Sequence, residues 1–120
     1  MTENPAFDVI KEVTIGGLPT DIVCHKFSNK TLLIITQYSK IANVVTVENQ
    51  VFNGAATNKQ KVFEIQPKMG NVTDETEGAI RYLMNYINCN HLVVSLALKK
   101  INKDILIELR NELGKIDCLK

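Results

Sequence analysis

The chain has 120 residues, with 14 basic and 13 acidic side chains and a formal net charge of +1. This near balance excludes the strongly basic surface typical of proteins that bind nucleic acids or anionic membranes. The hydrophobic fraction of 45% is that of an ordinary folded domain, and no apolar run approaches the ~18 residues that a transmembrane helix needs. We therefore expect a single domain over residues 8–120, preceded by a flexible tail at residues 1–7, with neither nucleic acid nor membrane as a partner.

The first half of the chain has the pattern of consecutive β-strands. Residues 8–15 place apolar and polar side chains on both faces, a mixed pattern that is typical of an edge strand. Gly16-Gly17 predicts a turn, and a second strand follows over residues 20–28. Residues 31–37 and 42–48 predict a third and a fourth strand. The connections are too short for a crossover helix, so we expect antiparallel neighbours.

The third strand is the predicted centre of the sheet. A strand with one face in water alternates apolar and polar side chains, whereas this strand is apolar at successive positions. We therefore expect both of its faces to be buried, and residues 91–98 show the same pattern. The residues of these two strands that we predict to form the core or a dimer interface are Leu32, Leu33, Ile34, Ile35, Leu92, Val94, Leu96 and Leu98.

In the second half of the chain the period changes. Residues 59–66 predict a fifth strand, which Pro67 ends. From Asp74 onward, apolar side chains recur at helical spacing, and Asp74 with Glu77 three residues later predicts a capping box. Asn102 is the predicted cap of a last helix, which follows the sixth strand.

These elements predict an α+β fold in the order β-β-β-β-β-α-β-α. We expect a six-stranded antiparallel sheet with the two helices on one face. Two amphipathic helices cover one face of such a sheet and leave the other uncovered, and an exposed apolar face is an interaction surface. We therefore expect the uncovered face to pack against a partner subunit, and the isolated chain to form a homodimer.

Residues capable of metal binding or catalysis are few. Cys24, His25, Cys89 and His91 are candidate zinc ligands, but no C-x-x-C pair occurs, and neighbouring strand residues point to opposite faces. The N-terminal sequence lacks the pattern of a signal peptide, so we expect the cysteines to be reduced. We predict no catalytic residue, metal or cofactor. A small cytosolic enzyme that depends on the thiol of Cys24 or Cys89 is the alternative.

Two polar segments are candidates for contacts with other proteins. Tyr38 and Lys40, in the turn after the third strand, combine an aromatic ring and a cation without an evident structural need for either. Because tyrosine is enriched at interface hot spots and loops on a rigid scaffold carry binding functions, we predict that both residues bind a partner. Lys99, Lys100 and Lys103 form a basic cluster, which is either a solvated surface or a contact with an acidic partner.

The stretch from Ile15 to Glu48 resembles the proteasome assembly chaperone 3 family. From Ala79 to Leu113, the helix–strand–helix pattern and its apolar positions also agree with that family. The order of several short motifs carries the resemblance, since none is decisive alone. These motifs are Gly17-Leu18-Pro19-Thr20, Val23-Cys24, Phe27-Ser28, the apolar strand running into Thr36-Gln37-Tyr38-Ser39-Lys40, and then Val45 and Glu48.

The resemblance implies a non-enzymatic chaperone located in the cytoplasm, with the nucleus as a second location. It implies a heterodimer with assembly chaperone 4, formed through sheet faces. The heterodimer would help alpha-type subunits to form the alpha ring of the proteasome core particle. A generic dimeric adaptor of other assemblies is the further alternative.

Overall fold

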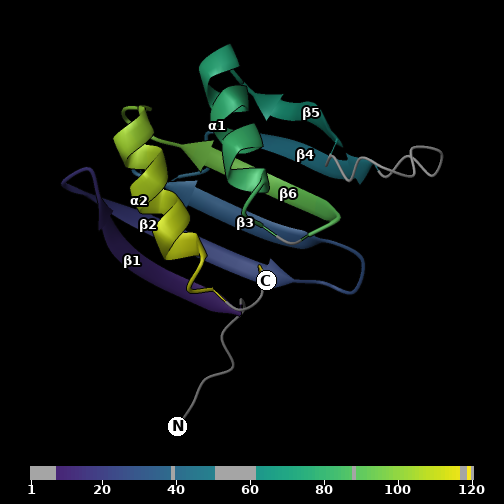
Figure 1. Cartoon of the computed structure of the whole chain (residues 1–120), viewed down its shortest axis with the longest axis horizontal. Helices are drawn as coiled ribbons and strands as arrows, with labels where there is room; N and C mark the ends of the chain where they lie inside the picture. Colours follow the sequence, from purple (N-terminus) through teal and green to yellow (C-terminus); the bar gives the residue numbers. More distant parts are fainter. Residues whose placement is uncertain (1–7, 39, 51–61, 88, 117–118, 120) are drawn as a thin grey trace, which may run out of the picture.

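The fold was described from a computed structural model, which covers residues 8–38, 40–50, 62–87, 89–116 and 119. The predicted tail at residues 1–7 and the start of the predicted fifth strand lie outside this part of the chain. The strands form one six-stranded sheet in the order β1-β2-β3-β6-β4-β5 (Figure 1). The strands are β1 (Val9–Ile15), β2 (Leu18–Lys26), β3 (Thr31–Thr36), β4 (Asn43–Gln50), β5 (Val62–Gly70) and β6 (His91–Ala97), and the helices are α1 (Asp74–Met84) and α2 (Lys103–Leu113).

The sheet is mixed, so the prediction of a purely antiparallel sheet is wrong. β6 lies between β3 and β4, and it runs parallel to β3 and antiparallel to β4. The connection between β3 and β4 is therefore not a hairpin, because it passes across the end of β6. Its few residues suffice for this crossing, since two inter-strand spacings amount to about 10 Å. The predicted antiparallel pairs β1–β2 and β2–β3 are confirmed, as is the edge position of β1. β5 is the antiparallel neighbour of β4.

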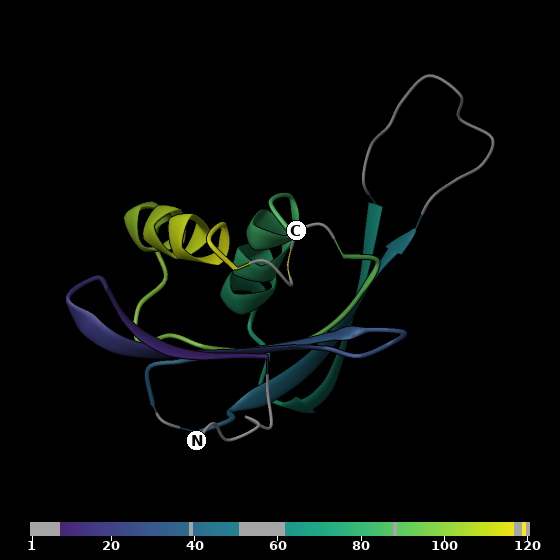
Figure 2. The ribbon, with the colours of Figure 1, turned by 90° about the horizontal axis from the view of Figure 1, so that it is seen from below.

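Both helices pack on the same face of the sheet, as predicted (Figure 2). Because side chains alternate along a strand, every second side chain of β2, β3, β6 and β4 points into the core between the sheet and the helices. α1 contributes Ile80, Leu83 and Met84, and α2 contributes Ile105, Leu109 and Leu113, at the spacing of a single helical stripe. The fully buried strand residues of this core include Ile22, Leu33, Ile35, Val45, Val47, Leu92 and Leu96.

The two helices begin at different kinds of cap. Asn102 caps α2 as predicted, because its Oδ1 accepts a hydrogen bond of 2.9 Å from the N–H of Ile105. The predicted capping box at Asp74 is wrong. Thr73 is the cap of α1, and its hydroxyl oxygen accepts a hydrogen bond from the N–H of Thr76. Asp74 instead lies in the first turn, where its negative charge suits the helix dipole.

β5 does not end at Pro67, contrary to the prediction. The strand continues to Gly70, and the register shifts next to this proline: Val44 pairs with Met69 and Val45 with Pro67, which leaves Lys68 of β5 without a register partner. β5 is an edge strand, so a proline without an N–H is tolerated on its unpaired side.

Two buried amide side chains hold the β3–β4 connection in place. Gln37 donates from Nε2 to the carbonyl of Ile15 and the hydroxyl of Thr20, and its Oε1 accepts from the N–H of Lys99 at 2.8 Å. At the other end of the connection, the Asn43 amide bonds to both backbone groups of Leu96. The two amides substitute for ladder hydrogen bonds where regular pairing stops, so the connection is anchored at both ends.

Candidate protein-binding surface

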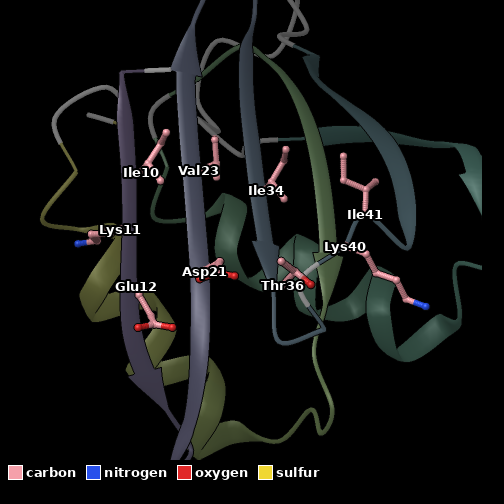
Figure 3. Close-up of a pocket in the computed structure, with 9 residues that line it drawn as sticks. All are labelled: Ile10, Lys11, Glu12, Asp21, Val23, Ile34, Thr36, Lys40 and Ile41. Atoms are coloured by element: carbon pink, nitrogen blue, oxygen red, sulfur yellow. The ribbon is translucent and has the colours of Figure 1, made fainter. Parts of the chain in front are cut away.

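The face of the sheet opposite the helices carries a row of apolar side chains. Ile10, Val23 and Ile34 are aligned across β1, β2 and β3, because Ile10 is the register partner of Val23 and Val23 that of Ile34. Ile41, from the β3–β4 connection, extends this row (Figure 3). Ile10 is 62% exposed and Ile41 is 50% exposed, whereas Val23 and Ile34 are half-buried. We call these four residues the apolar row.

A second row, next to the first, is polar. It consists of Glu12, Asp21 and Thr36, each two residues from a member of the apolar row on the same strand, and of Lys40, which precedes Ile41 in the connection (Figure 3). Glu12 and Asp21 are direct register partners, an arrangement in which like charges repel. Neither carboxylate forms an ion pair with another residue in the part of the chain that the structure describes. The two rows together line an open groove of about 520 Å³.

This face lacks the cover that the opposite face has. α1 and α2 lie on the other side of the sheet, and only the β3–β4 connection passes beneath it among the described residues (Figure 2). Isoleucines exposed by half or more, set beside unpaired carboxylates, are typical of a surface that another protein covers, because each group gains from a complementary partner.

The predicted core or dimer residues divide between the two faces. Leu33, Ile35, Leu92, Val94 and Leu96 are buried beneath the helices, and Leu98 packs partly against that core. Leu32 and Ile34 point to the opposite face and are half-buried. The β3 pattern therefore reflects a helix-covered face and an apolar face without helices.

The predicted partner-binding residues lie at one edge of this face. Tyr38 is 47% exposed, and the Nζ of Lys99 is 5.5 Å from the centroid of its ring. Its N–H donates to the hydroxyl of Thr36, which fixes the start of the turn. Lys40 is exposed and borders the groove. The structure thus brings Lys40 next to the apolar row, and Tyr38 next to a lysine that is distant in sequence.

The groove residues that the sequence analysis did not assign to a binding surface include Ile10, Glu12, Asp21, Val23 and Ile41. A signal for four of them was present: the turn at Gly16-Gly17 sets the β1–β2 register, which aligns Ile10 with Val23 and Glu12 with Asp21. Ile41 had no such signal, because its position depends on the crossing of β6.

Two of the three cysteines, Cys24 and Cys89, lie in the described part of the chain. Cys24 is fully buried and disulfide-bonded, so the expectation of a reduced thiol is wrong for this residue. Cys89 is a free thiol whose Sγ is 3.1 Å from the carbonyl oxygen of His91, as a donor to it. Cys118 lies outside the described part of the chain. Among the described residues, no group of three or more potential metal ligands comes together.

Neither α1 nor α2, the helices of the described residues, has the length and apolar character that crossing a bilayer requires.

Comparisons with known proteins identify the family. A family model described as proteasome assembly chaperone 3 matches residues 33–115, from β3 through α2. A chain in the crystal structure of a chaperone complex for yeast 20S proteasome assembly is similar in fold, with a TM-score of 0.68 and 11% sequence identity. The likeness covers 91% of this chain and 96% of that chain. No curated protein matches the chain in sequence. Because the family model spans well over half of the chain, including most of its core, the chain belongs to the proteasome assembly chaperone 3 family.

Proposed function

We propose that this protein is a non-enzymatic assembly chaperone that pairs with assembly chaperone 4 through the sheet face opposite its helices. The heterodimer then helps alpha-type subunits to form the alpha ring of the proteasome core particle, in the cytoplasm and also in the nucleus. The observation that carries the proposal is the apolar row, which no helix covers in the described residues.

The chemistry of this face suits pairing better than catalysis. The apolar row supplies area whose burial stabilises a complex, and the adjacent carboxylates favour a partner with facing cations. Tyr38 and Lys40 stand at the edge of the paired face, where they remain free for contact with alpha-type subunits. Such a contact must be released later, which suits a small polar surface at loops.

The test is co-purification of assembly chaperone 4 and alpha-type subunits with the tagged chain. Ile34→Glu places a charge in the middle of the apolar row and should abolish recovery of chaperone 4, because a buried unpaired carboxylate is costly. Ile10→Glu makes the same change at a side chain that is 62% exposed, so it carries little folding cost.

Tyr86→Glu is the matched control, since this ring is 54% exposed on the helical side of the molecule. Circular dichroism and urea midpoints establish that each variant folds. Full recovery of chaperone 4 with folded Ile34→Glu and Ile10→Glu would refute pairing through this face. Failure of the parent chain to recover any alpha-type subunit would refute the chaperone role.

A further inference from the structure

The parallel pairing of β3 and β6 brings two basic segments to the same edge of the sheet. Parallel neighbours end at the same edge, so the turn after Thr36 lies beside the segment after Ala97. Gln37 joins the two segments, because its N–H donates to the carbonyl of Ala97 and its side chain accepts from the N–H of Lys99. Gln37 is 8% exposed, so this junction is part of the buried scaffold.

Four lysines and one tyrosine are exposed at this edge, and we call them the lysine surface. They are Tyr38, Lys40, Lys99, Lys100 and Lys103. None of the four lysines forms an ion pair within the described part of the chain. The acidic residue nearest in sequence is Asp104, so the edge keeps a positive balance. The chain as a whole has a net charge of only +1, so the lysine surface is not part of a generally basic protein.

Tyr38 gives this surface an apolar centre. Its ring is 47% exposed and already carries the Lys99 ammonium group at 5.5 Å from its centroid. A tyrosine whose ring already contacts a cation loses little conformational freedom on binding, which is the property of an interface anchor.

We infer that the lysine surface binds an acidic protein segment that carries at least one apolar side chain. The apolar side chain would contact Tyr38, and the carboxylates would face the lysines. This inference deepens the proposed function, because Tyr38 and Lys40 belong to both, and it names the chemistry of the segment that an assembly partner presents there.

The surrounding charges favour a protein over a nucleic acid. Lys40 borders the same groove as Glu12 and Asp21, whose carboxylates repel a continuous phosphate backbone. The lysine surface contains no arginine, the residue best suited to bidentate phosphate contacts. Arg81 pairs with Glu77, and Arg110 donates to the hydroxyl of Tyr82, both within the helical layer.

The test is fluorescence anisotropy of a labelled oligoglutamate peptide that contains one phenylalanine, added to the full chain. The triple variant Lys40→Glu, Lys99→Glu, Lys100→Glu should bind the peptide at least about tenfold more weakly. The matched control is Lys26→Glu, Lys30→Glu, Lys68→Glu, which reverses as many exposed charges on other parts of the sheet and should stay within about threefold of the parent. Tyr38→Ala should weaken binding of this peptide but not of the same peptide without phenylalanine.

Three outcomes would overturn the inference. Equal loss in the two triple variants would show attraction by net charge alone. Equal or tighter binding of a labelled oligouridylate would show a nucleic-acid surface. Binding unaffected by raising the ionic strength from about 0.1 M to about 1 M, where the Debye length falls from about 10 to about 3 Å, would exclude a charge contact. Recovery of alpha-type subunits by the parent chain is a separate measurement: its failure refutes the proposed function, whereas the three outcomes above refute only the present inference.

Discussion

At the scale of single residues, the sheet contains two buried polar side chains with opposite hydrogen-bonding states. Asn43 is 4% exposed, and its amide both donates to the Leu96 carbonyl and accepts from the Leu96 N–H, at 2.9 and 3.1 Å. Ser95, next to Leu96 and 3% exposed, has a hydroxyl without a hydrogen-bond partner in the described structure. Burial alone therefore does not say what each side chain contributes to stability.

We expect Asn43→Ala to lower the free energy of unfolding by about 2–4 kcal/mol, because it leaves two buried backbone groups of Leu96 unpaired. Ser95→Ala removes a hydroxyl that has no hydrogen-bond partner in the described structure. We expect this variant to lower the free energy of unfolding by less than about 1 kcal/mol, or to raise it. Urea denaturation of both variants measures the difference. Similar values for the two would mean that the Asn43 hydrogen bonds contribute little.

The role of Asn43 could not be predicted from the sequence. Its partner Leu96 lies 53 residues away, and the contact exists only because β6 is inserted beside β4. The cap of α2 was predictable, since Asn102 bonds to a residue three positions on. The α1 cap shows the limit of local reasoning, because Thr73 and Asp74 are both good caps and the backbone decides between them.

At the scale of secondary-structure elements, what could be predicted depended on sequence separation. The helical stripes and the strands were visible as periodicities of 3.6 and 2 residues. The position of β6 was not, because a strand apolar on both faces fits at any central place and parallel pairing leaves no local turn signal. The predicted uncovered face followed from counting helices and did not require the strand order.

Two glycines, one inside a helix and one at the end of a strand, allow a matched test of backbone conformation. Gly78 lies within α1, where an added Cβ meets no atom within 4 Å. We expect Gly78→Ala to raise the free energy of unfolding by about 1 kcal/mol, since alanine restricts the unfolded chain and favours helix.

Gly70, at the end of β5, has a φ of +80°, and an added Cβ would overlap the carbonyl oxygen of Ala42. Gly70→Ala should therefore lower the free energy of unfolding by about 2 kcal/mol or more. Thermal and urea unfolding of the two variants should shift in opposite directions. A stabilised Gly70→Ala would contradict the left-handed conformation at this position.

At the scale of the whole molecule, the sheet has unequal faces. One face is closed by two helices with a continuous core, and the other has the apolar row, the Glu12–Asp21 pair and the β3–β4 connection. If a second protein covers the open face, as proposed, the stability of the fold should depend on what is bound there.

This dependence gives the last prediction, that the isolated chain is a homodimer whose melting temperature rises with protein concentration. If two chains fold and pair together, a tenfold increase in concentration should raise the melting temperature by about 2–4 °C for a chain of this size. Ile10→Glu, which disturbs the apolar row at an exposed position, should melt at a temperature independent of concentration. Light scattering coupled to size exclusion should give twice the mass of one chain for the parent and the mass of one chain for this variant. A parent whose melting temperature stays constant over about a hundredfold range of concentration, with the mass of one chain throughout, would show that the open face does not pair with itself, and would leave a different protein as its partner.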